Sequence, residues 1–263
     1  MTAPRRLPRR AASVLAMVPL VLAVTAVSLP AEAGKSDYRL DRATERRGDP
    51  VVRWNPCQTE VTYKANLTYA GSSSAARSAA LRDVKGAVAR VSSATGIHFT
   101  YEGGTTQVPR STSSAKWWDR QQSTEIVIAW VRQSKSSARS NLLGGSGSGW
   151  AAGTGGYVYK THNSTKSGRY VAPIGRGFVV LNSAQNRAFR SGFGSGSTRG
   201  ALLMHELGHV MGLQHVGATS EIMYPTILRR TRTYYRSGDR AGLARVGRPA
   251  GCISVPSSIW RQV

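Results

Sequence analysis

Three of the five histidines in the chain, His205, His209 and His215, lie within eleven residues of one another. On an α-helix the first two share a face, because residues four apart lie one above the other. Gly212 can adopt a left-handed conformation that ends such a helix, after which the chain can turn back and bring in His215. Three neutral imidazoles that leave a fourth position to water are typical of a catalytic zinc site. We therefore expect these three histidines to bind one zinc ion.

Glu206 follows the first histidine directly. At that position its carboxylate can reach a water on the metal without binding the metal itself. Zinc lowers the pKa of such a water towards ~7, so a neighbouring carboxylate can act as its general base. The short pattern H-E-x-x-H arises by chance on amphipathic helices. The extended pattern fixes five positions, which disfavours a surface helix with unrelated histidines.

A methionine follows the third histidine by eight positions, in Glu221–Ile222–Met223–Tyr224–Pro225. Taken alone, Met223 is an ordinary core residue. The extended histidine motif followed by a short methionine-containing turn resembles the metzincin zinc peptidases, and its Met-Tyr-Pro most resembles the matrixin branch. The resemblance is firm over 199–225 and looser over about 51–246. It implies that Met223 lies beneath the zinc as an apolar floor and is not a ligand.

The same resemblance implies an α+β fold, the metzincin catalytic domain. That fold is a twisted mixed β-sheet with packed helices, whose active-site helix floors a cleft. The implied activity is a secreted zinc endopeptidase that hydrolyses protein or peptide substrates, with Glu206 as general base. An extended substrate would pair with an edge strand around residues 151–159. Two alternatives remain: an exported basic protein that binds polyanions or cell wall, and a zinc amidase acting on a non-peptide cell-wall linkage.

Apolar periodicity predicts the elements that must position these residues. A half-buried strand is expected at Val61–Ala65, and a helix through Leu81 and Val91 that ends at Gly96. A run of apolar residues at Glu125–Val131 predicts a central strand buried on both faces. Other strands are expected at 97–101, 156–159 and 177–181, an active-site helix from Ser197 or Thr198 to Gly212, and a last helix capped by Ser237 or Asp239.

The N-terminus has the organisation of an export signal. Four arginines precede an apolar run from Ala11 to Leu29, and Ala31–Glu32–Ala33 fits a cleavage site. We therefore expect residues 1–33 to be a signal peptide, 34–50 a flexible leader, and 51–263 a single catalytic domain. The mature protein would be secreted and free of the membrane. The alternative is that the apolar run is retained as a membrane anchor.

Cys57 and Cys252 are the only cysteines. In an exported chain two cysteines near opposite ends of a domain most simply form one disulfide. The rival interpretation is that Cys57 is a thiolate switch on the zinc, which the available partner Cys252 disfavours.

The formal net charge is +23, and the basic residues are scattered along the chain. Such a surface allows incidental binding of polyanions, but no nucleic-acid-binding motif accompanies it. The charge also predicts no selectivity for basic side chains in a substrate. Residues 141–177, rich in Gly and Ser, contain no Asp or Glu, so the sequence gives no support to a calcium site of the kind found there in several matrixins. We expect a monomer.

Overall fold

The computed structural model describes residues 37–43, 48–58, 60–111, 124–144, 151–164 and 166–255. The predicted signal peptide, residues 1–33, lies outside the described residues. The alternative of a membrane anchor at 11–29 lies outside them as well. None of the helices in the described ranges is long and apolar enough to cross a membrane.

A mixed β-sheet forms the centre of the domain. Its strand order is β2-β8-β5-β3-β4, all parallel, and β6 and β7 pair antiparallel with β8. The strands are β2 (Val52–Arg53), β3 (Val61–Asn66), β4 (Phe99–Gly104), β5 (Ile126–Val131), β6 (Gly153–Tyr159), β7 (His162–Asn163) and β8 (Tyr170–Asn182). The twisted mixed sheet expected from the sequence is therefore confirmed.

Strand β5 lies inside the sheet between β3 and β8, and all six of its residues are buried. Its continuous apolar sequence fits this position, because side chains on both faces are covered. Strand β6 pairs with β8 alone among the described strands, so its other edge is open to a partner. The face of β6 that carries Gly153 and Gly155 packs against helix α2 (Arg199–Val210).

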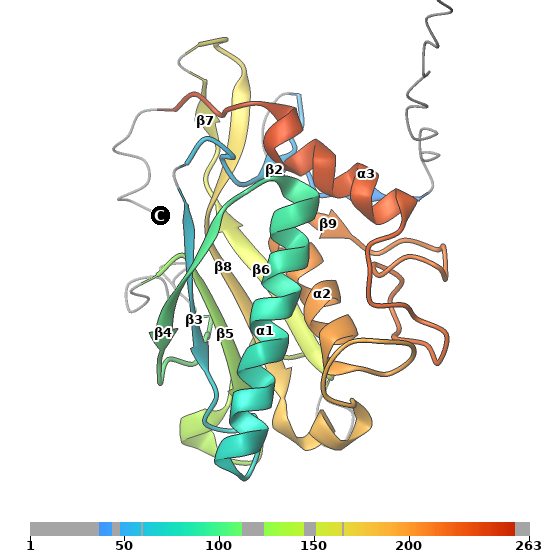
Figure 1. Ribbon diagram of the computed structural model, residues 1–263. Coiled ribbons are helices and arrows are strands. Elements are labelled where there is room, and N and C mark those ends of the chain that lie inside the picture. Colours follow the sequence, from blue (N-terminus) through green and yellow to red (C-terminus); the bar gives the residue numbers. More distant parts are fainter. Residues whose placement is uncertain are drawn as a thin grey trace, which may run out of the picture. The chain divides into compact units, whose positions relative to one another are not determined.

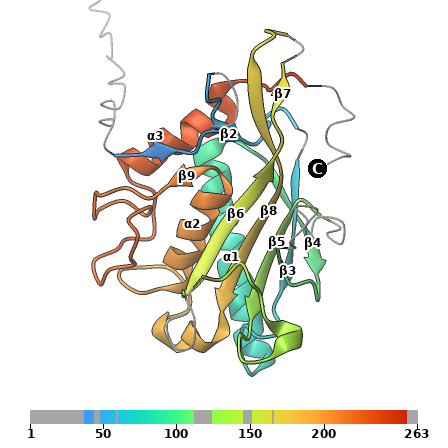
Figure 2. The same ribbon diagram turned by 180° about the vertical axis from the view of Figure 1, so that it is seen from behind.

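Within the described ranges, three α-helices accompany the sheet: α1 (Ser74–Thr95), α2 (Arg199–Val210) and α3 (Ser237–Val246). Short 3-10 helices lie at Ser136–Ala138, Ser183–Ala188 and Arg248–Ala250. Helices α1 and α2 cover the same face of the sheet (Figure 1), and the view from behind places the strands in front of both (Figure 2). A buried ion pair joins the two helices, with Arg199 Nη2 2.6 Å from Asp83 Oδ2.

Most predicted element boundaries agree with the structure within a few residues. Helix α1 ends at Gly96, which has the left-handed φ of 70° that its position requires. Helix α3 begins at Ser237, but its N-cap is Arg236, and Asp239 lies inside the first turn. The strands predicted at 156–159 and 177–181 are parts of the longer β6 and β8. The strand predicted at 97–101 begins at Phe99.

The segment expected to be a flexible leader is ordered where it is described. Its strand β1 (Arg39–Leu40) pairs antiparallel with β9 (Leu213–Gln214), directly before His215. The backbone N–H of Asp41 donates to Gly212 O at 2.8 Å, and Ala43 is fully buried. This segment supplies hydrogen-bond partners for backbone groups that the turn after α2 leaves unpaired. The polar composition of the segment gives no sign of this role. The domain therefore extends N-terminal of residue 51.

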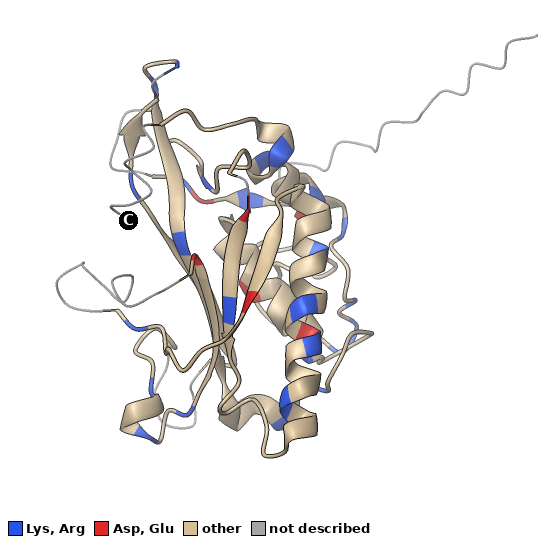
Figure 3. Cartoon of the chain, turned by 60° about the vertical axis from the view of Figure 1, so that its left-hand side comes forward, with Lys and Arg blue, Asp and Glu red and all other residues tan. Residues whose placement is uncertain are grey.

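Basic side chains are distributed over the whole described domain. Figure 3 shows Lys and Arg on helices, strands and loops, with few Asp or Glu among them. The described part of the chain contains one ion pair, Arg199–Asp83. The described domain therefore carries a large excess of positive charge.

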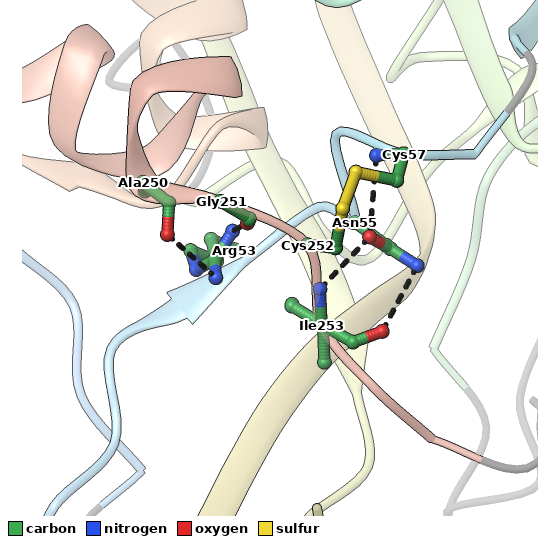
Figure 4. Close-up of a disulfide and its surroundings, with 7 residues drawn as sticks. All are labelled: Arg53, Asn55, Cys57, Ala250, Gly251, Cys252 and Ile253. Atoms are coloured by element: carbon green, nitrogen blue, oxygen red, sulfur yellow. Dashed lines mark hydrogen bonds between the residues drawn. A yellow bond between two sulfur atoms is a disulfide. The ribbon is translucent and has the colours of Figure 1, made fainter. Parts of the chain in front are cut away.

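A disulfide between Cys57 and Cys252 ties the end of the domain to its beginning (Figure 4). Asn55 reinforces this junction, since its Oδ1 accepts from the backbone N–H of Ile253 at 3.0 Å and from that of Cys57 at 3.2 Å. Arg53 adds a hydrogen bond to Gly251 O at 2.8 Å. The expected disulfide is confirmed, and it leaves no free thiol at Cys57 for a switch.

Candidate active site

Helix α2 is held almost entirely inside the protein. Every one of its residues except His209 is buried. The helix begins where the Thr198 side chain accepts from the backbone N–H of Ala201 at 3.1 Å, a typical N-cap. Packing against α1 on one side and β6 on the other fixes its rotation. The direction of its side chains is therefore set by the surrounding core.

The three histidines predicted as ligands converge on one point. Nε2 of His215 lies 3.1 Å from Nε2 of His205 and 3.1 Å from Nε2 of His209. The first and second histidines come from successive turns of α2, and the third comes from the loop after β9. Gly212, which lies between His209 and His215 in the chain, has a φ of 93°. The chain therefore turns back at the residue predicted from the sequence.

Backbone carbonyls fix the tautomers of two of these rings. His205 Nδ1 lies 2.7 Å from Ile222 O, and His209 Nδ1 lies 2.8 Å from Leu213 O. A carbonyl can only accept, so each Nδ1 carries the proton and each Nε2 presents a lone pair. Histidines that bind metal are commonly oriented by this kind of outer hydrogen bond.

The surroundings favour neutral imidazoles. Burial, with the neighbouring His209, lowers the pKa of His205 to about 3. Burial also lowers the pKa of His209 and of His215. Unprotonated rings are the form that coordinates a metal ion.

The donor set and its spacing fit a zinc ion. A tetrahedral ion with zinc–nitrogen bonds of about 2.0–2.1 Å holds its ligand nitrogens about 3.3–3.4 Å apart, close to the 3.1 Å separations here. Among the described residues, His205, His209 and His215 form the single group of three His, Cys, Asp or Glu side chains whose ligand atoms lie within 4.8 Å of one another. Three imidazoles with a free fourth position suit a catalytic ion.

The Glu206 side chain is buried next to these rings, with 4% of the residue exposed. Burial raises its pKa to about 8, although the backbone N–H of Gly155 donates to the carboxylate and opposes the shift. A divalent cation held by the neighbouring histidines would lower that pKa again. Such a carboxylate is suited to accept a proton near neutral pH.

Glycines of β6 allow this carboxylate to lie against the strand. A Cβ at Gly153 would lie 2.8 Å from Glu206 Oε1, and one at Gly155 would overlap the backbone of Glu206. A larger residue at either position would push α2 and β6 apart. This requirement was not predicted from the sequence, because the strand was expected only at 156–159. The two-residue spacing of these glycines, which places both on one face of a strand, was the available signal.

The turn that contains Met223 lies directly under α2. Met223 is buried, and a Cβ at Gly208 would overlap its Sδ and lie 3.2 Å from its Cε. The preceding residue, Ile222, supplies the carbonyl that orients His205. Met223 is not among the converging ligands.

Asp239 of α3 holds this turn in place. Its Oδ2 accepts from the backbone N–H of Ile222 at 2.6 Å, and its Oδ1 accepts from that of Met223 at 3.2 Å. Burial, with the nearby Glu221 charge, raises the pKa of Asp239 to about 7. The sequence marked Asp239 as a helix cap only, because its partners are distant in the chain and no local pattern reveals them.

Two hollows meet at the histidines. One, of about 560 Å³, lies along Tyr157 and Tyr159 and includes Arg39 and Asp41 of the N-terminal segment. The other, of about 510 Å³, contains Glu206. Both are lined by Gly155, His209 and His215. The predicted ligands and base therefore share one cleft beside β6.

Comparison with known proteins agrees with this arrangement. A family model described as Matrixin matches residues 53–246, which is most of the chain and runs from the end of β2 to the end of α3. No curated protein gives a significant match. Because the family model covers the sheet, α2 and the turn beneath it, the chain belongs to the matrixin family of peptidases.

Proposed function

We propose that the protein is a zinc-dependent endopeptidase whose reaction takes place in the cleft beside β6. The observation that carries the proposal is the convergence of three Nε2 atoms, two of them held as lone-pair donors, in a cavity that also contains a buried carboxylate. Membership of the matrixin family, whose members generally use a catalytic zinc, supports it.

In this proposal His205, His209 and His215 hold the zinc, which when bound activates a water and polarises the scissile carbonyl. Glu206 accepts a proton from the attacking water and then delivers it to the leaving amine. Its position supports this role, because the carboxylate lies in the same hollow as the three histidines. The carbonyls of Ile222 and Leu213 keep the rings oriented throughout.

The open edge of β6 is the proposed binding site for substrate backbone. An extended polypeptide can add to such an edge through main-chain hydrogen bonds. Gly153–Tyr159 borders both hollows, so a substrate paired with it would pass the histidines. Beyond them, Phe189, Leu202 and Ile227 line the hollow of about 510 Å³, which suits an apolar side chain.

We also propose that the protein is exported and acts outside the cell as a monomer, after removal of residues 1–33. A cut after Ala33 would preserve the ordered segment that begins near Asp37 and pairs with β9. Sequencing the N-terminus of protein recovered from culture medium tests this. A start near Gly34 is expected, whereas protein that stays in the membrane with its first residues intact would contradict it.

Hydrolysis of an unfolded protein such as reduced casein tests the activity. We expect cleavage that stops with 1,10-phenanthroline, returns with added zinc, and is absent from His209→Ala. Activity that is unaffected by the chelator would contradict the proposal. Zinc binding without cleavage of any polypeptide, together with cleavage of a cell-wall amide, would favour the amidase alternative.

A further inference from the structure

The segment Arg230–Arg236, which follows the Met223 turn, alternates between exposed and buried residues. The buried members are Thr231, Thr233 and Tyr235, and the exposed members are Arg230, Arg232, Tyr234 and Arg236. The chain bends at Thr233 and Tyr234, so the segment is not a continuous extended strand. Three of the exposed residues are arginines that line one hollow, and we call them the arginine face (Arg230, Arg232 and Arg236).

The inward side chains fix this segment to the rest of the protein. The Tyr235 hydroxyl donates to Met204 O of α2 at 2.8 Å. Thr233 Oγ1 accepts from the backbone N–H of Gly194 at 2.7 Å, and Thr231 Oγ1 accepts from that of Leu228 at 2.8 Å. The arginine face is therefore built on a backbone that is anchored at alternate residues.

The arginine face borders a hollow of about 310 Å³, which Thr219, Ser220 and Tyr234 also line. Arg230 Nη2 donates to Thr219 Oγ1 at 2.9 Å, and Arg236 Nη1 donates to the Tyr234 hydroxyl at 2.7 Å. Arg232 donates to Ser195 Oγ. Each guanidinium carries five N–H groups, so most of the donors are not used by these contacts.

The positive charge of the arginine face is not neutralised by the protein. Within the described ranges none of the three guanidinium groups has a carboxylate oxygen within 4.0 Å. The nearby acidic residues Glu221 and Asp239 are buried, and their carboxylates accept from backbone N–H groups. The hollow therefore combines uncompensated cations with hydroxyl groups, a combination suited to oxyanions.

The three arginines line one hollow, so carboxylates of one acidic polypeptide can meet them together. In an extended ligand, carboxylates at every second residue lie on one side and repeat about every 6.6 Å. Ile227 lines the catalytic cavity, and Arg230 lies three positions further along the chain, a distance of at most about 11 Å. A polypeptide bound in the cleft can therefore continue onto the face.

We propose that Arg230, Arg232 and Arg236 bind an acidic segment of the polypeptide substrate outside the catalytic cavity. This inference rests on the proposed peptidase function, and it adds a substrate class to it: proteins with alternating acidic residues near the cleaved bond. It also agrees with the expectation that a chain with a charge of +23 does not select basic residues.

The test measures binding without turnover. Glu206→Gln in the full chain is titrated with a labelled peptide that has Glu at alternate positions, and with the same peptide carrying Gln instead, using fluorescence anisotropy. The arginine-face variant is Arg230→Gln/Arg232→Gln/Arg236→Gln. Its matched control removes three exposed arginines elsewhere in the described chain, as Arg82→Gln/Arg132→Gln/Arg169→Gln.

We expect the Glu peptide to bind about tenfold more tightly than the Gln peptide at low salt, the sum of three modest exposed charge pairs. The arginine-face variant should lose this difference and the control should keep it. Equal binding of the two peptides, or equal losses in variant and control, would overturn the proposal. Inorganic polyphosphate that binds through the face while the Glu peptide does not would overturn it in favour of a polyanion site. If the Glu peptide binds more tightly than the Gln peptide but the wild-type chain hydrolyses no polypeptide, the peptidase proposal is refuted and the binding face is still supported.

Discussion

The contact between Gly208 and Met223 gives a quantitative test of how the turn supports the active-site helix. Replacing Gly208 by Ala adds a Cβ that would overlap Met223 Sδ, and Met223 is only 1% exposed, so its side chain has little room to move. Overpacking of this kind costs about 1–3 kcal/mol, while Gly→Ala within a helix gains about 1 kcal/mol. We therefore expect Gly208→Ala to destabilise the protein by up to about 2 kcal/mol.

The effect of Gly208→Ala on the free energy of unfolding should change sign when the Met223 side chain is removed. Met223→Ala alone should cost about 2–5 kcal/mol, as for other buried large-to-small changes. In that background the added methyl group meets no sulfur, so Gly208→Ala should stabilise the protein by about 1 kcal/mol. The coupling between the two substitutions is then about 1–3 kcal/mol.

Urea unfolding at constant pH measures the free energies of unfolding of the wild type, the two single variants and the double variant. The metal-free proteins are used because bound metal would itself stabilise the folded state. Gly217→Ala is the matched control, because a Cβ there meets no atom within 4 Å, and it should change stability by less than about 0.5 kcal/mol. If Gly208→Ala stabilises the protein equally in the wild-type and the Met223→Ala backgrounds, the proposed packing of the turn against α2 is refuted.

Three further predictions follow from contacts away from the histidines. Replacing both Cys57 and Cys252 by Ser opens a loop with a sequence separation of 195, and should lower the unfolding free energy by up to about 5 kcal/mol in chemical denaturation; an unchanged midpoint would contradict this. Asp83→Asn leaves the Arg199 guanidinium buried without its carboxylate, and should cost about 3 kcal/mol in the same assay, with Arg82→Gln on the exposed side of α1 as a neutral control. Because the pKa of Asp239 is raised from 3.8 to about 7, the folded state binds a proton more tightly than the unfolded state, so its contribution to stability falls as pH rises from about 4 to about 7. The free-energy difference between wild type and Asp239→Asn should therefore fall with pH by at most about 1.4 kcal/mol per unit, and a difference that rises over this interval would contradict the assignment.

Local patterns predicted the parts of the site that depend on local geometry. Two histidines four residues apart require only a helix to share a face, and Thr198 gives that helix a recognisable start. The apolar run of β5 identified a strand buried on both faces. These features are encoded within a few residues, so no knowledge of the tertiary fold was needed.

Other parts depend on elements that meet only in the folded protein. Gly155 is needed because α2 crosses β6 closely, and a Gly-rich composition alone suggests a loop. The segment around Arg39 is polar and looks mobile in sequence, yet its backbone pairs with β9 beside the third histidine. Asp239 carries the pattern of a cap, while its main partners are the backbone N–H groups of the Met223 turn. Each of these contacts is set by long-range packing, for which a single sequence holds no direct signal.

The central claim is that three histidines bind zinc while Glu206 performs proton transfer. It is tested most directly by measuring zinc content and casein hydrolysis on the same samples of wild type and Glu206→Gln. We predict one zinc per chain in both proteins, and loss of nearly all hydrolysis in the variant alone. A variant that retains zinc and full activity would contradict the role of Glu206, and a wild-type protein that binds no zinc would contradict the site itself.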